Sequence, residues 1–132
     1  METKLLSSTP MIKCRELTKT YYMGDSEYKA LRGINLDIGS NELVALIGAS
    51  GSGKTTTMQI LGLLSTQTSG DYTLLEHDTA KLNADQKADL RNQHIGFIFQ
   101  SYSLLPRLSA LENVMLPTRY SNITHKQAVK RA

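Results

Sequence analysis

The sequence contains a single cysteine, Cys14, and no long hydrophobic run. One cysteine cannot form an internal disulfide, which is typical of a protein from a reducing compartment. No apolar run approaches the roughly 20 residues that a membrane-spanning helix needs. The N-terminal segment, with one lysine and the short apolar pair Leu5 and Leu6, lacks the features of a signal peptide. We therefore expect a cytoplasmic chain that reaches a membrane only through a partner.

A strong excess of one charge is also missing. The chain has 15 basic and 12 acidic residues, for a net charge of +3. The charges are scattered, and only Lys126, Lys130 and Arg131 form a small basic group. We therefore expect no nucleic-acid partner. The three histidines are scattered without metal-ligand spacing. A hydrophobic content of 40% over 132 residues is typical of one modest globular domain.

One segment matches the phosphate-loop (Walker A) pattern G-x-x-x-x-G-K-[ST]: Gly48-Ala49-Ser50-Gly51-Ser52-Gly53-Lys54-Thr55. An apolar run at residues 43–47 precedes the loop, and the helix-compatible residues 56–61 follow it. This strand–loop–helix context distinguishes a nucleoside-triphosphate site from the alternative, a glycine-rich turn that binds nothing.

The residue types of this loop fit the chemistry of a triphosphate. Glycines allow backbone N–H groups to surround phosphate oxygens, and the helix beginning near Lys54 adds its positive end. Lys54 supplies a charge between the β- and γ-phosphates, and the hydroxyl of Thr55 is available to Mg²⁺. We expect ATP to be bound by the loop and the start of the helix: Gly48, Ala49, Ser50, Gly51, Ser52, Gly53, Lys54, Thr55 and Thr56.

The rest of the pattern predicts an α/β fold. Strands are expected at residues 11–17, 34–38 and 72–75, with polar loops or turns at 21–29 and 66–71. Residues 43–47 and 95–99 are apolar on both faces, which indicates buried central strands. The helix after the phosphate loop is apolar nearly all round, so we expect it to be buried.

Three further helices are predicted from their first residues. Asn83 with Gln86, Ser109 with Glu112, and Thr124 with Gln127 have the spacing of capping pairs. The first of these helices is expected to end near residue 92, and Pro117 to limit the second. Ile123 and Ala128 are placed for a hydrophobic staple on the third. That helix is only a short stub, so the sequence looks cut rather than designed to end there.

With these motifs, the chain resembles the ATPase subunits of ABC transporters, in particular the macrolide-export and lipoprotein-release group. The similarity covers nearly all residues from 11 onward and is carried by residues 17–21, 30–34, the phosphate loop, 68–70, 90–92, 95–100, 104–106 and 110–114. The segment Gly96-Phe97-Ile98-Phe99-Gln100 separates this family from other phosphate-loop proteins better than the loop alone.

The resemblance implies further site residues and partners. Tyr21 matches the aromatic residue that stacks on adenine, although the adjacent Tyr22 is an alternative. Gln100 matches the glutamine that contacts Mg²⁺ and water, so it is a catalytic and metal-site candidate beside Lys54 and Thr55. Residues 101–108 would contact a transmembrane permease. The resemblance also implies a second nucleotide-binding subunit, and a location at the inner face of the cell membrane through the permease.

Several family motifs do not occur in this sequence. The Ser-Gly-Gly-Gln signature, the Walker B aspartate, the glutamate after it and the switch histidine are absent. Residues 11–132 are therefore expected to form the N-terminal portion of a nucleotide-binding domain, after a flexible segment at residues 1–10. This portion would contain an antiparallel β subdomain and the start of a parallel core sheet. Without a neighbouring Walker B strand, residues 43–47 would expose a hydrophobic edge.

Three interpretations remain at this point. The chain is the N-terminal half of an ABC ATPase that binds ATP with little or no hydrolysis by itself. Alternatively, it is a short ATP-binding module without turnover that pairs with a separate C-terminal half. A third class, another phosphate-loop enzyme such as a kinase or GTPase, is disfavoured because no Asn-Lys-x-Asp guanine motif is present.

Overall fold

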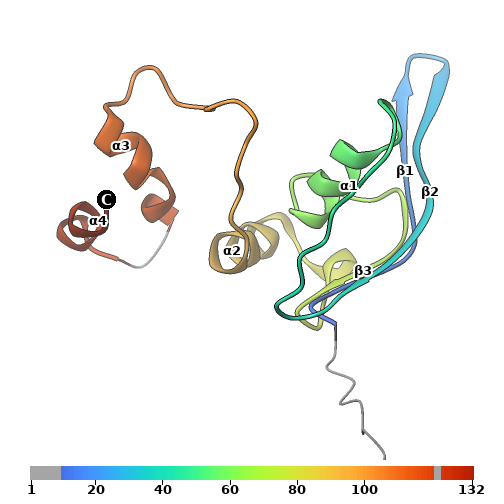
Figure 1. Ribbon diagram of the computed structural model, residues 1–132, viewed down its shortest axis with the longest axis horizontal. Coiled ribbons are helices and arrows are strands. Elements are labelled where there is room, and N and C mark those ends of the chain that lie inside the picture. The colour runs from blue at the N-terminus through green and yellow to red at the C-terminus, as the bar shows by residue number, and fades with distance from the viewer. Residues whose placement is uncertain (1–9, 121–122) are drawn as a thin grey trace, which may run out of the picture. The chain divides into compact units, whose positions relative to one another are not determined.

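The computed structural model describes residues 10–120 and 123–132. The expected flexible segment at residues 1–10 therefore lies, except for Pro10, outside the described residues. The chain divides into two compact units, one extending to Lys87 and the other from Ala88 onward, and each is described by itself. Figure 1 shows the strands in the first unit and short helices in the second.

The first unit is built on a four-stranded antiparallel sheet with the order β2-β1-β3-β4. Its strands are β1 (Ile12–Met23), β2 (Ser26–Ile38), β3 (Ser69–Leu74) and β4 (His77–Asp78). The strands expected at residues 11–17, 34–38 and 72–75 are thus confirmed within longer strands, except that residues 11 and 75 lie just outside β1 and β3. The first unit also contains α1 (Lys54–Leu61) and the short 3₁₀ helix η1 (Thr79–Lys81).

The polar loop expected at residues 21–29 is wrong, because β1 and β2 continue into a tight hairpin. Tyr21 pairs with Tyr28, and Met23 pairs with Ser26. Only two residues connect the strands, and Gly24 has the positive φ (59°) that two-residue hairpin turns require. Local polarity indicated a loop, but backbone pairing between the strands decides the structure.

The polar turn expected at residues 66–71 is also wrong in its second half, since β3 begins at Ser69. Ser69 pairs with Thr18 of β1, and their hydroxyl groups lie 2.7 Å apart. The N–H of Thr68 donates to the carbonyl of Thr18 (2.9 Å). Pairing with β1 therefore brings small polar residues into the sheet.

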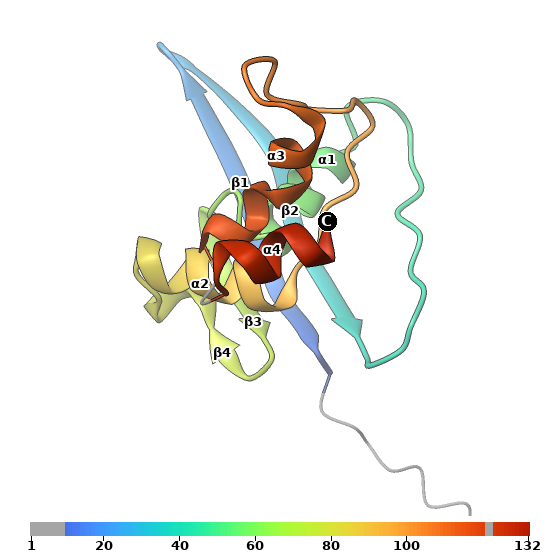
Figure 2. The same ribbon diagram turned by 90° about the vertical axis from the view of Figure 1, so that its left-hand side faces the viewer.

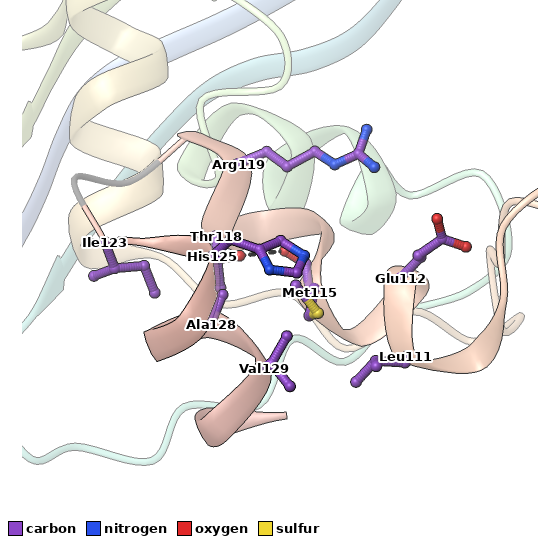
Figure 3. A pocket seen from close by; sticks show the side chains of 9 residues that line it. All are labelled: Leu111, Glu112, Met115, Thr118, Arg119, Ile123, His125, Ala128 and Val129. Carbon is purple, nitrogen blue, oxygen red and sulfur yellow. Dashed lines mark hydrogen bonds between the residues drawn. The ribbon is translucent and has the colours of Figure 1, made fainter.

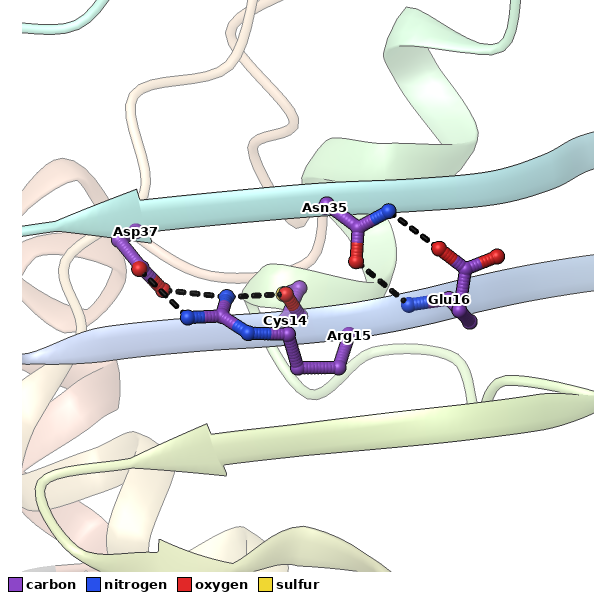
Figure 4. A network of polar contacts seen from close by, with 5 residues as sticks. All are labelled: Cys14, Arg15, Glu16, Asn35 and Asp37. Atoms are coloured by element: carbon purple, nitrogen blue, oxygen red, sulfur yellow. Dashed lines mark hydrogen bonds and ion pairs between the residues drawn. The ribbon is translucent and has the colours of Figure 1, made fainter.

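A bulge at Glu16 interrupts β1 and is fixed by polar contacts to β2 (Figure 4). Glu16 has φ 46°, its N–H donates to Oδ1 of Asn35 (3.0 Å), and the Asn35 amide donates back to the Glu16 carboxylate. Beside the bulge, Arg15 donates two hydrogen bonds of 2.6 Å to Asp37. The Arg15 guanidinium lowers the pKa of the Asp37 carboxyl through these bonds. Bulges increase the local twist of a strand, so this network shapes the ribbon that carries the hairpin tip.

The core of the first unit lies between the sheet and α1. Its fully buried side chains include Cys14 and Leu17 from β1, Tyr72 from β3 and Ile60 from α1. The hydroxyl of Tyr72 donates to the carbonyl of Leu61 (2.6 Å), which links β3 to the end of α1. Burial raises the pKa of the Tyr72 phenol, so it remains protonated as a donor.

The expectation that α1 is buried nearly all round is wrong. Thr57 and Ile60 are buried, but Met58 is 55% exposed, and Leu64 just beyond the helix is 50% exposed. The sheet covers one face of α1, and the described part of the first unit covers no other face completely.

The central strands expected at residues 43–47 and 95–99 are not formed. Residues 43–47 belong to the long irregular connection between β2 and α1, seen as a wide arc in Figure 2. Leu43 and Ile47 are 102% and 93% exposed, and Ile98 in the other segment is 101% exposed. A strand needs neighbours for its N–H and C=O groups, and neither segment pairs with a strand among the described residues. The predicted hydrophobic exposure at 43–47 is observed, although without strand structure.

The second unit contains α3 (Ala110–Met115), the 3₁₀ segment η2 (Leu116–Tyr120) and α4 (His125–Arg131), while α2 (Ala84–His94) crosses the boundary between the units. α2 continues two residues beyond its expected end. α3 ends before Pro117, as predicted.

All three predicted capping pairs are confirmed. Asn83 and Gln86 exchange two hydrogen bonds of 2.9 Å at the start of α2. Both α3 and α4 begin with complete capping boxes, formed by the pairs Ser109–Glu112 and Thr124–Gln127.

Candidate nucleotide site

The phosphate loop connects the irregular segment after β2 to α1. Gly51 and Gly53 have φ values of 78° and 89°, a region that suits glycine rather than residues with a side chain. Gly53 is the N-cap of α1, and no side chain caps the helix. The first N–H groups of α1 are therefore available to an anion, with the positive end of the helix dipole behind them.

β2 supports the loop through a close contact at Gly53. A Cβ atom at Gly53 would lie 2.6 Å from the carbonyl oxygen of Ala30 and 2.7 Å from Cδ2 of Leu31. Ala30 and Leu31 both belong to β2, and both are buried. On the other side of Gly53, its carbonyl accepts hydrogen bonds from the N–H (2.8 Å) and hydroxyl (3.0 Å) of Thr57. Glycine at position 53 therefore lets the start of α1 lie directly against the sheet.

Lys54 folds back over the loop. Its Nζ donates to the carbonyls of Gly48 (2.8 Å) and Ala49 (2.7 Å). It also lies 3.4 Å from the hydroxyl of Ser52. Phosphate oxygens are stronger acceptors for an ammonium group than neutral carbonyls, so the same side chain can turn to a bound phosphate.

The predicted loop residues are brought together around one hollow. A cavity of about 200 Å³ is lined by the following residues: Tyr28, Ser50, Gly51, Ser52, Gly53, Lys54, Thr55 and Thr56. Gly48 and Ala49 contact this group of residues because their carbonyls accept hydrogen bonds from Lys54. Tyr28 is a site residue that the polar pattern of residues 21–29 does not predict, because that pattern indicates a loop. The hairpin signal, Gly24-Asp25 between β-forming residues, could have placed it opposite Tyr21.

The hairpin separates the two candidates for adenine stacking. Directly paired residues of an antiparallel sheet share a face, so Tyr21 lies on the same face of the ribbon as Tyr28, whose hydroxyl contacts the loop. Tyr22 points to the opposite face and is 72% exposed. The Nζ of Lys19 lies 5.1 Å from the centre of the Tyr21 ring and donates to the carbonyl of Thr66, which holds that lysine in place.

Gln100 lies in the second unit, exposed, in the irregular segment between α2 and α3. The following segment is organised by Asn113 of α3, which the sequence analysis also missed. Its side-chain amide donates to the carbonyls of Leu105 (3.2 Å) and Leu108 (3.1 Å), and its Oδ1 accepts from the N–H of Leu105. Residues 105–108, part of the predicted permease-contact segment, are thus tied to α3.

A second hollow, of about 300 Å³, lies between α3 and α4 (Figure 3). Its lining is mainly apolar and includes Met115, Ala128 and Val129, together with Ile123, the predicted partner of Ala128 in the staple. Its one carboxylate, Glu112, is engaged in the capping box, and the N–H and hydroxyl of Ser109 lower its pKa. This hollow has no glycine-rich backbone to surround a phosphate, and its cation, Arg119, lies near the carboxylate of Glu112, which also helps to lower the pKa of that carboxyl.

The donor set of the described residues fits Mg²⁺ together with a nucleotide. Within the described ranges, no group of three or more His, Cys, Asp and Glu side chains could hold a metal ion. Thr55 lines the loop cavity, and a threonine hydroxyl is a suitable Mg²⁺ ligand. Mg²⁺ commonly keeps several waters and binds substrate phosphates with few protein ligands, so this arrangement is chemically adequate. In the part of the chain that the structure describes, no helix could span a membrane.

A glycine-rich loop that leads into a helix beside a sheet defines a phosphate-loop nucleotide-binding protein. The sequence profile of the ABC transporter family matches residues 31–132, and the chain belongs to this family.

Individual relatives agree with this assignment. The chain is 47% identical over 124 residues to the macrolide export ATP-binding/permease protein MacB of Escherichia coli K12, and 46% identical to MacB of Shigella flexneri. These matches cover 94% of this chain and 19% of the length of each relative. Two dimeric structures of the ATP-binding cassette MJ0796, one of them bound to ADP and Pi, match with TM-scores of 0.84 and 0.83 and identities of 40% and 39%. Both cover 92% of this chain, which spans about half (53%) of the cassette.

The contact at Gly53 predicts a large effect of Gly53→Ala on stability. The added methyl group meets the backbone of β2 and also faces a positive φ, so we expect the free energy of unfolding to fall by about 2 kcal/mol or more. Urea unfolding followed by circular dichroism measures this change.

Gly24→Ala is the matched control. Gly24 also has a positive φ (59°), but a Cβ atom there meets nothing within 4 Å. We expect Gly24→Ala to lower the free energy of unfolding by about 1 kcal/mol, because alanine disfavours a positive φ. Equal losses for the two variants would contradict the supporting role of β2.

Proposed function

We propose that this chain binds MgATP through residues 48–56 as the nucleotide-binding part of an ABC transporter. The observation that carries the proposal is the loop geometry: two glycines with positive φ at the uncapped start of α1, held against β2. In this proposal Lys54 turns from the carbonyls of Gly48 and Ala49 to the β- and γ-phosphates. Thr55 ligates Mg²⁺, and the N–H groups of the loop surround the phosphates.

The complete protein, in our proposal, couples ATP binding and hydrolysis to export or lipoprotein release through a transmembrane permease. The relatives named for both ATP binding and permease function support a membrane partner. The dimeric cassettes support a second nucleotide-binding subunit. The chain would then act at the inner face of the cell membrane. Gln100 would contribute to the Mg²⁺ and water site, and the segment held by Asn113 would contact the permease.

We further propose that this chain by itself turns over little or no ATP. Phosphoryl transfer depends on an oriented water and complete charge stabilisation. The Walker B aspartate, the glutamate after it and the signature motif do not occur in this sequence. Lys54 and Gln100 are the catalytic residues it does supply.

One observation fits the alternative as well, an ATP-binding module that pairs with a separate C-terminal half. The apolar residues Leu43, Val44, Leu46 and Ile47 are all exposed. Strands from such a half would satisfy the backbone of this segment and bury these side chains. The nucleotide site is the same in both proposals, so one test addresses both.

Replacing Lys54 by alanine should weaken MgATP binding roughly 10- to 100-fold, since it removes charge-assisted hydrogen bonds to phosphate. Isothermal titration calorimetry with MgATP measures the change in Kd. Lys126→Ala removes the same charge from an exposed position on α4 and serves as the control. An unchanged Kd for Lys54→Ala, or an equal loss in both variants, would count against the proposed site.

Replacing Tyr21 by alanine should weaken ATP binding about tenfold, because base–aromatic stacking is lost. The same variant should bind inorganic triphosphate normally, since that ligand has no base. Tyr22→Ala removes a tyrosine from the opposite face and should leave both affinities unchanged. Competition with a fluorescent ATP analogue measures all of these values. If only Tyr22→Ala weakened ATP binding, the stacking role would belong to Tyr22.

A further inference from the structure

Tyr28 contacts the phosphate loop from outside the Walker A motif. It lies on β2, and its hydroxyl donates to the carbonyl of Gly51 at 3.2 Å. Its side chain lines the loop cavity together with residues 50–56. β2 therefore meets the loop at two places: a backbone contact at Gly53 and a side-chain hydrogen bond at Gly51.

This hydrogen bond acts on a single peptide unit. The carbonyl of Gly51 and the N–H of Ser52 belong to one planar peptide, so they point in opposite directions. The carbonyl accepts from Tyr28, and the N–H donates to the carbonyl of Ala49 at 3.2 Å. The peptide is thus held at both ends by hydrogen bonds.

Without the bond from Tyr28, this peptide would be held only by the hydrogen bond from the N–H of Ser52 to Ala49. Gly51 has no side chain, and a Cβ atom placed there would meet nothing within 4 Å. Glycine populates positive and negative φ about equally, so rotation of the Gly51 carbonyl has a low steric cost. A carbonyl oxygen turned toward a phosphate would repel it, because both are electronegative acceptors.

We propose that Tyr28 is a positioning residue for the phosphate loop. Its hydroxyl keeps the carbonyl of Gly51 bonded to β2 and therefore away from a bound phosphate. The inference rests on the proposed function, since it assigns a residue to the same ATP site. It differs from the stacking role of Tyr21, because the hydroxyl group rather than the ring carries it.

The hairpin geometry supports the role of the hydroxyl. The pairing of Tyr28 with Tyr21 fixes its backbone in β2, so the side chain projects from a defined position. The side chain is 46% exposed, so the ring contributes only partly to the core. Phenylalanine at this position retains the ring and its packing and removes only the hydrogen bond to Gly51.

Tyr28→Phe therefore tests the proposal in the full chain. We expect its affinity for MgATP and for inorganic triphosphate to fall by the same factor, about fivefold, with no change in unfolding temperature. The amide resonance of Ser52 should also shift in the free protein, because its peptide loses a hydrogen bond. Tyr120→Phe, at a tyrosine on η2 that is 75% exposed, is the control and should change none of these values.

Each other outcome has a defined meaning. If the unsubstituted chain binds neither ligand, the proposed function fails and this inference fails with it. If the unsubstituted chain binds both ligands and Tyr28→Phe binds them with unchanged Kd values, this inference alone is overturned. A loss for ATP but not for triphosphate would assign Tyr28 to the base and overturn its positioning role. A lowered unfolding temperature with an unshifted Ser52 amide would show a purely structural role.

Discussion

The close approach of Gly53 to the backbone of β2 is the constraint on which the rest of the site depends. No side chain fits between Gly53 and the carbonyl of Ala30, so the start of α1 is held directly against the sheet. This contact fixes where the N–H groups of the helix begin. The hairpin then presents Tyr28 to the loop and Tyr21 on the same face. The sheet that carries the hairpin is therefore also the scaffold of the phosphate site.

The antiparallel sheet forms because its strands supply one another with hydrogen-bond partners. The two apolar segments at residues 43–47 and 95–99 have no such partners in the described parts of the chain, and their side chains are exposed. The chain spans about half of the cassettes that it resembles. The site is consequently built from segments that contact one another within the described residues, namely the loop, α1 and the hairpin. In our proposal, strands of the complete protein pair with these apolar segments.

Sequence reasoning succeeded where the structure depends on neighbouring residues. The capping pairs, such as Ser109 with Glu112, and the helix that follows the glycine-rich loop involve residues close together in the chain. It failed where pairing between distant residues determines the structure. The apolar pattern of residues 43–47 could not reveal whether neighbouring strands exist. It also missed Tyr28, because its role depends on the register that places it opposite Tyr21 and near Gly51.

The central claim is that residues 48–56 form a phosphate site supported by β2. A titration of the ¹⁵N-labelled chain with MgATP, followed by amide NMR, tests it most directly. We predict saturable shifts of the amides of Gly51, Ser52, Gly53, Lys54 and Thr55, accompanied by Ala30 and Leu31 on β2. No shifts in the loop, or shifts confined to the hollow between α3 and α4, would contradict the account.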